Sequence, residues 1–576
     1  MIIGYVFTLV YSILLAGLLS SAFLLRKTIS QRLSKATTPL FIVMALMIII
    51  FFILFSILYV SPVEQLYFDD NIYQGIALNI LHHGNALWCQ YGTALLTSCP
   101  YSQMYHDPVE ISFYIAIAFA VFGVGAQTAY GLSLLVGAAS ILIVFLLGSM
   151  FFGKKAGLAS AVVFALIPEL FIWSRTQAVP DLIFMMFSLL TFLAYEIYRG
   201  SRSRTALTFF LFALGIAVYS RIEAMLLVPI FIALAVIEAW SKHGFREGLY
   251  RFLGKANTGT LIIILFFFVL ITPEIYYISS ELHNPNYGSG SLCGSQTSTI
   301  LSISNFKCNI VPNTNFFLGT LNGRYNYPAY FSVMTTIIAV IGALYMIFGR
   351  KRLGMQFAIL GLWVLAYHFF YDAFYAGSVL FGVDVRFMLV IYPAISIFAG
   401  YGIAGLSDII PNAMGRLGKA GGKGRTSAVA AATFVLLIVA FSIFPFYNSL
   451  SIITMKPSSM PQESMPLSAV NFIYQNAQKV PNTCLVFSFT PDVWWALNKS
   501  AAQVGWLGNN MSNFTGFESG FSCFVFDKGY WCTTPDYKKG TCSTDLSSYN
   551  TTLIASAEAP DQVDNYSLVY LNGYKT

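Results

Sequence analysis

Long apolar segments recur along this chain of 576 residues, and they constrain its fold more than any other feature. The mean hydropathy is +0.69 and only 10% of the residues are charged, whereas soluble globular chains carry about 25%. A helix needs roughly 20 apolar residues to cross a bilayer. We therefore expect a polytopic α-helical membrane protein with about 12 transmembrane helices. The predicted spans are residues 1–25, 37–60, 128–150, 156–174, 182–198, 205–219, 224–240, 258–276, 329–348, 354–371, 387–406 and 427–446.

The connections between these spans alternate in charge. Twenty of the 32 Lys and Arg residues lie in the connections after the first, third, fifth, seventh, ninth and eleventh spans, with only Glu247 and Asp408 as acids. The positive-inside rule places these connections in the cytoplasm and the other connections, with both termini, outside. The net charge of +7 is thus a topology signal, and we expect no nucleic-acid partner.

Two apolar segments need a separate interpretation. Residues 109–126 would reverse the alternation if they crossed the membrane, so we expect a helix that lies along the outer membrane face. Residues 1–25 have the length of a signal peptide, but no positive charge precedes the apolar run. This favours a retained first span.

All eight cysteines lie in segments that are predicted to face outward. An even number of cysteines in outward loops is typical of disulfides formed in an oxidising compartment. Zinc binding is the alternative, but no CxxC motif occurs and the chain after residue 446 has no histidine. Proximity suggests the pairs Cys89–Cys99, Cys293–Cys308, Cys484–Cys523 and Cys532–Cys542, although the partners within the last two pairs can be exchanged.

The composition changes after the last predicted span. We expect a transmembrane domain over residues 1–446 and a soluble extracytoplasmic α/β domain over residues 447–576. The predicted strands are residues 484–489, 523–526 and 566–571, and the predicted helices are residues 467–477 and 492–497. Five Asn-x-Ser/Thr sequons agree with an exposed, glycosylated outer surface, at Asn498, Asn510, Asn513, Asn550 and Asn565.

Charged residues gather at the outward ends of the predicted spans. The first outward segment, residues 61–127, carries Asp69 and Asp70 directly after an apolar run, and then His106 and Asp107. Adjacent carboxylates beside a membrane helix are costly unless water, a cation or a substrate meets them. Helix ends tolerate single charges, but acids and arginines on one face together indicate a cavity that binds an anionic group beside a general base. The later outward turns add Arg175, Asp181, Arg221, Glu223, Asp372 and Arg386.

The order of these motifs resembles the GT-C superfamily of membrane glycosyltransferases, especially its protein O-mannosyltransferase and aminoarabinose-transferase branch. The resemblance covers roughly residues 40–400, which leaves residues 1–25 as an additional helix. Where the family often has a second Pro or a Lys beside the His-x-Pro element, this chain has Asp107, which argues against a phosphate role there. The matching stretches are Phe68–Ala77, His106–Pro108 and Arg175–Asp181, with weaker likeness at Tyr219–Glu223 and Val385–Phe387.

The resemblance implies a sugar donor carried on a polyprenyl phosphate, and transfer to a protein, lipid or lipid-linked glycan on the outer face. Asp69 matches the family's first acid and is the expected general base of an inverting transfer, while Asp70 orients the acceptor or Asp69. Asp181 matches a second family acid. The expected substrate-binding residues are His106, Asp107, Arg175, Asp181, Arg221, Glu223 and Arg386, with the arginines as ligands of the phosphate leaving group.

The need for a metal differs between branches of the resembled superfamily. Asp69, Asp70 and Asp181 offer oxygen ligands for Mg²⁺ or Mn²⁺, as in the oligosaccharyltransferase branch. The mannosyltransferase-like branch mostly works without one, so the resemblance leaves both a metal-free site and a divalent-cation site open. The oligosaccharyltransferase branch also carries a Trp-Trp-Asp motif, whereas Trp494 and Trp495 are followed here by alanine. We expect both tryptophans to lie in a core.

Three alternatives to the glycosyltransferase on polyprenyl phosphate are an oligosaccharyltransferase-type enzyme, a lipid or glycan transporter (flippase) and a surface protein with a membrane anchor. A transporter would carry polar residues deep in its spans and paired broken helices, which the sequence does not show. A membrane anchor needs only one helix, so the twelve predicted spans argue against a surface protein of this kind. Disulfides and sequons suit an archaeal or bacterial cell surface as well as the lumen of the endoplasmic reticulum. The absence of a retention signal such as Lys-Asp-Glu-Leu at Gly573–Thr576 favours an archaeal or bacterial cell membrane.

Overall fold

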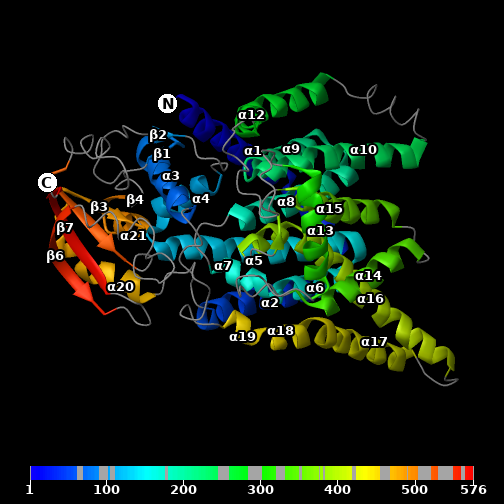
Figure 1. The fold of residues 1–576 in the computed structure, drawn as a ribbon. Helices are drawn as coiled ribbons and strands as arrows, with labels where there is room; N and C mark the ends of the chain where they lie inside the picture. The colour runs from blue at the N-terminus through cyan, green and yellow to red at the C-terminus, as the bar shows by residue number, and fades with distance from the viewer. Residues whose placement is uncertain are drawn as a thin grey trace.

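Helices form most of the described chain and pack side by side in one bundle, with a small β-sheet at one end (Figure 1). The structure is a computed structural model. It describes residues 2–60, 69–89, 102–103, 110–175, 180–243, 258–282, 301–319, 331–348, 353–374, 377–379, 383–417, 423–454, 467–489, 491–503, 521–529, 549–558 and 565–574.

Each of the twelve predicted spans corresponds to a helical segment. Nine helical segments of the described chain are long and apolar enough to cross a membrane, and a bent pair makes a tenth. The other two predicted spans are the shorter apolar helices α9 (Arg204–Val218) and α14 (Val333–Phe348). The nine segments lie in α1 (Ile2–Ala36), α2 (Pro39–Tyr59), α5 (Ala126–Phe152), α8 (Pro180–Ser201), η1 (Ile222–Leu226) with α10 (Leu227–His243), α12 (Thr258–Leu282), α15 (Gly354–Ala373), α16 (Tyr392–Leu417), and α17 (Lys423–Ile438) with its continuation η4 (Val439–Ile443) and α18 (Phe444–Asn448).

Three of the predicted spans differ in detail from the structure. The first helix continues to Ala36, because Arg26–Ala36 contains neither Pro nor Gly, so its four basic residues lie on a helix rather than in a loop. The span over 156–174 is two helices, α6 (Lys154–Ala165) and α7 (Pro168–Ser174), bent by 63° where Pro168 begins the second. The span over 387–406 begins as η3 (Val383–Val390), and its α-helix starts at Tyr392.

The described residues of segment 61–127, which is predicted to face outward, form two helices and two short strands. It holds α3 (Asp69–His83), the paired strands β1 (Trp88–Cys89) and β2 (Ser102–Gln103), and α4 (Glu110–Phe122). Helix α4 coincides with the helix predicted along the membrane face, and its first residues are buried while Val121 and Phe122 are exposed. Its depth in a membrane stays a prediction.

The C-terminal residues form the expected α/β arrangement. The sheet order is β4-β3-β5-β7-β6, with β4, β3 and β5 parallel and β7 antiparallel to both β5 and β6. The predicted helices are α20 (Leu467–Asn476) and α21 (Pro491–Ala496), while the predicted strands are β3 (Cys484–Ser488), β5 (Cys523–Lys528) and β7 (Tyr566–Tyr574). The sequence prediction missed β4 (Ser500–Gln503), which is short, and β6 (Tyr549–Ala557), whose middle is polar and exposed.

One predicted disulfide lies within this sheet. Cys484 and Cys523 are paired residues of neighbouring strands, with their Cα atoms 4.5 Å apart, and their sulfur atoms are bonded. Cys308 is disulfide-bonded as well, but its expected partner Cys293 lies outside the described residues. The pairs Cys89–Cys99 and Cys532–Cys542 involve residues outside the described part and stay predictions.

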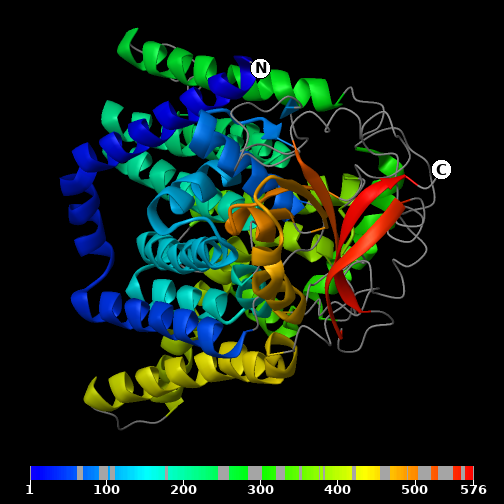
Figure 2. The ribbon, with the colours of Figure 1, turned by 90° about the vertical axis from the view of Figure 1, so that its left-hand side faces the viewer.

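The bundle has two distinct ends. The sheet, α3 and the β1–β2 pair lie together at one end, which we call the sheet end (Figures 1 and 2). At the other, the basic end, Arg199 and Arg202 of the α8 terminus pair with Glu238 near the end of α10. There Lys155 of α6 also pairs with Asp408 of α16 at 3.0 Å. Basic residues predicted to share one side of the membrane are therefore neighbours in space.

Candidate active site

Four of the predicted site residues form one charged network. Asp181 is the second residue of α8, Arg221 immediately precedes η1, Glu223 lies in η1 and Arg386 lies in η3. Arg221 Nη1 is 3.0 Å from Asp181 Oδ1, and Arg221 Nε donates to Glu223 Oε1 at 2.5 Å. Arg386 Nε is 3.5 Å from Asp181 Oδ2. Three segments far apart in sequence thus converge on Asp181.

The network is buried and balanced in charge. Asp181, Arg221 and Glu223 are 2%, 6% and 3% exposed, and Arg386 is the most exposed, with 13% of its side chain accessible. Two carboxylates face two guanidinium groups, so no net charge is carried into the helical bundle. A buried charge is tolerated when an opposite charge lies beside it, as it does for all four residues of this network. The pairing holds both arginines in fixed positions.

Aromatic residues surround this network. The Tyr371 hydroxyl of α15 donates to Glu223 Oε1 at 3.0 Å. The guanidinium groups of Arg221 and Arg386 lie 4.8 and 5.5 Å from the ring centre of Phe387, within cation–π distance. Phe387 in turn stacks on Tyr371, with ring centres 5.6 Å apart. The sequence analysis named Phe387 only as part of the family-like stretch Val385–Phe387, and it did not name Tyr371, because apolar helices supply tyrosine and phenylalanine at many positions.

Arg175 lies outside this network. It follows α7, and its Nε donates to the carbonyl oxygen of Val60 at 3.4 Å. Its guanidinium is 5.9 Å from the ring centre of Tyr130. Val60 is the last described residue before Asp69. The hydrogen bond from Arg175 therefore fixes the backbone at the end of α2, before the segment that carries Asp69 and Asp70.

The expected catalytic acids lie at the start of a helix. Asp69 and Asp70 are the first two residues of α3, at the sheet end of the bundle (Figures 1 and 2). Their side chains are outside the described part of the structure, and so are His106 and Asp107. The structure thus gives the position of the helix that carries the acid pair, while the roles of these four residues stay predictions.

Comparison with known proteins agrees with this architecture. Residues 106–277 match the family described as dolichyl-phosphate-mannose-protein mannosyltransferase. ArnT from Cupriavidus metallidurans, in a crystal structure with undecaprenyl phosphate, is 13% identical with a TM-score of 0.56, covering 93% of this chain and 98% of ArnT. The oligosaccharyltransferase AglB from Archaeoglobus fulgidus, with an inhibitory peptide and dolichol-phosphate, is 13% identical with a TM-score of 0.51, covering 88% of this chain and 72% of AglB. No curated protein sequence gives a significant match.

The chain has the GT-C fold. The expected resemblance is therefore confirmed at the level of the fold, over almost the whole length of both chains. The family match contains Arg175, Asp181, Arg221 and Glu223, while Asp69, Asp70 and Arg386 lie outside it. At this identity the likeness extends to the fold of the GT-C enzymes and not to the role of any residue.

The expected metal ligands of this GT-C protein do not assemble in the described residues. No group of three or more His, Cys, Asp or Glu side chains converges within the described ranges, which exclude the side chains of Asp69 and Asp70. Asp181, the third expected ligand, has one oxygen near Arg221 and the other near Arg386. A carboxylate held between two guanidinium groups is a poor cation ligand. We therefore assign no chemical step to a metal.

The structure separates Asp372 from the network. Asp372 is fully buried near the end of α15, where its Oδ1 accepts from Asn313 Nδ2 at 2.9 Å. Asn313 belongs to α13 (Ile303–Phe317), a helix that the sequence analysis missed. Asn309, one turn earlier, donates to the carbonyl oxygens of Asp372 and Phe374 at 3.2 and 3.0 Å. The asparagines of α13 thus satisfy the last carbonyl oxygens of α15, and Asp372 binds one of these asparagines. The spacing of four residues between Asn309 and Asn313 was the sequence signal that could have predicted α13.

The C-terminal sheet contacts the helix that carries the acid pair. Both tryptophans of α21 are buried, as predicted. Trp494 Nε1 donates to Asp527 Oδ2 of β5 at 2.9 Å, which fixes α21 to the sheet. A Cβ atom at Gly75 of α3 would lie only 3.0 Å from Trp495 Cη2, so the indole ring packs directly on the helix backbone. Strand β5 therefore contacts α21, and α21 contacts α3, so the sheet is linked to the helix that begins with Asp69.

Proposed function

We propose that this protein is a membrane glycosyltransferase that moves a sugar from a polyprenyl-phosphate donor to an acceptor on the outer face. The observation that supports it most is the buried network of Asp181, Arg221, Glu223 and Arg386 in a GT-C fold. Two arginines around one carboxylate provide fixed donors for an anion that forms during the reaction.

The proposed role of the network is to stabilise the phosphate leaving group. Arg386 is the most exposed member, and its Nε is 3.5 Å from Asp181, a long contact that a phosphate oxygen can replace. Guanidinium groups bind phosphate with two parallel hydrogen bonds. Arg221 is held more tightly by Asp181 and Glu223, so its proposed role is to position the network. Arg175 holds the approach to the acid pair through Val60.

The proposed general base is Asp69. Its carboxylate accepts the proton of the acceptor hydroxyl, and the acceptor oxygen forms a bond to the anomeric carbon. The bond from that carbon to the phosphate oxygen breaks on the opposite face of the sugar, which inverts its configuration. Asp69 and Asp70 begin α3, and the positive end of a helix dipole favours ionised carboxylates in the first turn. Asp70 orients Asp69 or the acceptor.

A lipid-linked donor suits this location. The acid pair follows α2, an apolar helix whose sides are largely exposed, so an isoprenoid chain can stay in lipid while the sugar phosphate reaches polar groups. The compared ArnT and AglB structures hold undecaprenyl phosphate and dolichol-phosphate respectively. The acceptor is a protein, a lipid or a lipid-linked glycan. The Cys484–Cys523 disulfide supports an outward position for the sheet end.

The test is a transfer assay with the purified full chain and a panel of polyprenyl-phosphate sugars, read out as consumption of each donor. We expect Asp69→Asn to lower the rate by 10²-fold or more, because loss of a general base costs about this much. Asp408→Asn at the basic end is the matched control and keeps full activity. Transfer by Asp69→Asn at the normal rate would refute the assignment of the base.

Three further measurements test this proposal against its alternatives. Nuclear magnetic resonance of the product reports whether the anomeric configuration is inverted. A lipid pyrophosphate glycan offered with an acceptor peptide tests the oligosaccharyltransferase alternative, and we expect no transfer from it. Movement of an intact labelled glycolipid across proteoliposomes, without cleavage of the sugar, would favour a flippase instead.

A further inference from the structure

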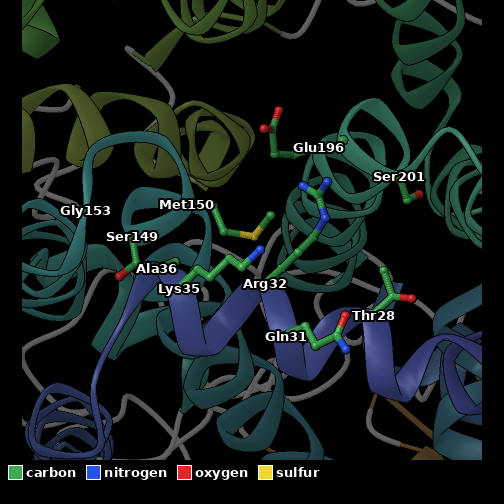
Figure 3. Close-up of a pocket in the computed structure, with 11 residues that line it drawn as sticks. Thr28, Gln31, Arg32, Lys35, Ala36, Ser149, Met150, Gly153, Glu196 and Ser201 are labelled. Atoms are coloured by element: carbon green, nitrogen blue, oxygen red, sulfur yellow. The ribbon is translucent and has the colours of Figure 1, made fainter.

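A polar cavity lies at the basic end, far from the proposed active site. Its volume is about 590 Å³, and the ends of three apolar helices, α1, α5 and α8, line it (Figure 3). Glu196 lines it, whereas Asp181 begins the same helix fifteen residues earlier. A helix rises 1.5 Å per residue, so the two sites are separated by roughly 22 Å. The cavity therefore plays no part in the proposed transfer step.

Two cations of α1 extend into this cavity. Figure 3 shows Arg32 and Lys35 pointing in the same direction, toward Met150 and the end of α8. The Arg32 guanidinium packs against Gly200, where a Cβ atom would collide with it, so the backbone of α8 leaves space for this side chain. This close packing fixes one of the two cations at the cavity wall.

The cavity has an excess of positive charge. Its acidic residue, Glu196, is already paired with Arg199 at 2.5 Å. Within the described residues no carboxylate forms an ion pair with Arg32 or Lys35. Thr28, Gln31 and Ser201 add polar groups to the lining. Glu196 attracts Arg32 as well as Arg199, so the two cations of α1 and Arg199 together exceed the one carboxylate of the lining. This excess positive charge is complementary to one phosphate group.

The position of the cavity indicates where that phosphate comes from. Phe23 and Leu24, one turn before Thr28, are 63% and 68% exposed, as expected for side chains that face lipid. The basic residues of α1 begin two positions later, at Arg26. The cavity thus lies at the level where an apolar surface changes to a polar one, which is the level of lipid headgroups. Basic pockets between spans on the cytoplasmic side attract anionic headgroups.

We propose that this cavity binds the phosphate headgroup of an anionic membrane lipid of the leaflet at the basic end. Arg32 and Lys35 contact the phosphate, Thr28, Gln31 and Ser201 contact the polar headgroup, and the acyl chains lie along the exposed side of α1. The proposal depends on the membrane assignment of α1, α5 and α8, and it does not depend on the glycosyltransferase function.

The test is native mass spectrometry of the full chain in detergent, titrated with dioleoylphosphatidylglycerol, dioleoylphosphatidylcholine or inorganic phosphate. We expect Arg32→Gln combined with Lys35→Gln to weaken phosphatidylglycerol binding roughly 10- to 30-fold, since each cation contributes a several-fold gain near a membrane surface. Arg26→Gln combined with Lys27→Gln is the matched control, because it removes the same charge from exposed positions of the same helix. The control binds within threefold of the unchanged protein.

Several outcomes would overturn the proposal. These are an equal loss in both double variants, an unchanged affinity in the Arg32 and Lys35 variant, or equal binding of phosphatidylcholine. Displacement of the lipid by millimolar inorganic phosphate would identify a site for a free anion instead. Lys35→Gln alone guards against misfolding, since Lys35 is exposed and its replacement leaves the Arg32–Gly200 packing intact. We expect it to weaken lipid binding about fivefold.

Discussion

At the scale of single residues, the two arginines of the network differ in exposure. Arg386 is more exposed and contacts Asp181 at 3.5 Å. We expect Arg386→Gln to lower kcat/KM about 100-fold with a small effect on melting temperature, and Arg386→Lys to recover part of the activity, because a lysine keeps the charge but not the bidentate geometry. Transfer rates and thermal melting of the same preparations check this. Unchanged kcat/KM would remove Arg386 from the site.

Arg221 serves as the contrasting residue. It is buried between Asp181 and Glu223, so Arg221→Gln leaves two carboxylates near each other with one cation fewer. Breaking a buried ion pair from one side costs about 3–5 kcal/mol in proteins. We therefore expect a clear drop in thermal stability and in folded yield, together with lost activity. Normal stability of this variant would show that the network is not held as the structure has it.

Asp527 introduces a pH dependence into the C-terminal sheet. It is fully buried, and burial raises the pKa of its carboxyl from 3.8 to about 6, although Trp494 and Ser488 donate hydrogen bonds to its Oδ2. The folded state therefore binds this proton more tightly than the unfolded state. Its contribution to stability is complete below pH 3.8 and is lost as the pH rises through 6. The shift in the pKa corresponds to a loss of about 3 kcal/mol in the free energy of unfolding as the pH rises.

The measurement compares the melting temperatures of the unchanged chain and Asp527→Asn between pH 4 and pH 7. Asparagine stays neutral and still accepts hydrogen bonds, so we expect the stability difference between the two proteins to shift in favour of the variant as the pH rises. A constant difference over this range would show that Asp527 does not titrate there.

At the scale of elements, the packing of α21 on α3 links the sheet to the helix that begins with Asp69. Gly75→Ala places a methyl group 3.0 Å from Trp495 Cη2 and 3.2 Å from Cζ3, so α3 and α21 must move apart by a few tenths of an ångström. Alanine itself favours a helix over glycine by about 1 kcal/mol, which offsets the stability cost. We expect kcat to fall roughly tenfold without unfolding, since small displacements of reacting groups cost rate steeply.

A compensating substitution tests whether the contact between Gly75 and Trp495 causes the expected loss of kcat. Phenylalanine lacks the outer ring of tryptophan, so Trp495→Phe in the Gly75→Ala background removes the clash, and we expect kcat to recover most of the loss. Gly131→Ala in α5 is the control, because nothing lies within 4 Å of its Cβ position. No recovery in the double variant would mean that the effect of Gly75→Ala comes from α3 alone.

At the scale of the whole molecule, the sequence predicted the positions of the helices better than the contacts between them. Apolar length identified a helix for each expected span, since lipid solubility requires such runs. It could not reveal the bend at Pro168 or the helix over Ile303–Phe317, whose asparagines form hydrogen bonds with the end of α15 and with the chain that follows it. The network was foreseen as a set of residues on one face. Its pairing joins Asp181 to Arg221 and Arg386, far apart in sequence, and only packing determines it.

The two ends of the bundle give the last prediction. Basic residues gather at one end and a disulfide lies at the other, so both charge and redox chemistry indicate that the ends face different compartments. Asp408 of α16 and Glu558 beyond β6 are exposed markers of the two ends. We expect a membrane-impermeant maleimide to label Glu558→Cys in intact cells and Asp408→Cys only after permeabilisation. A soluble cytoplasmic cysteine protein controls for leakage. Labelling of both positions in intact cells would contradict the topology and, with it, the outward position of Asp69.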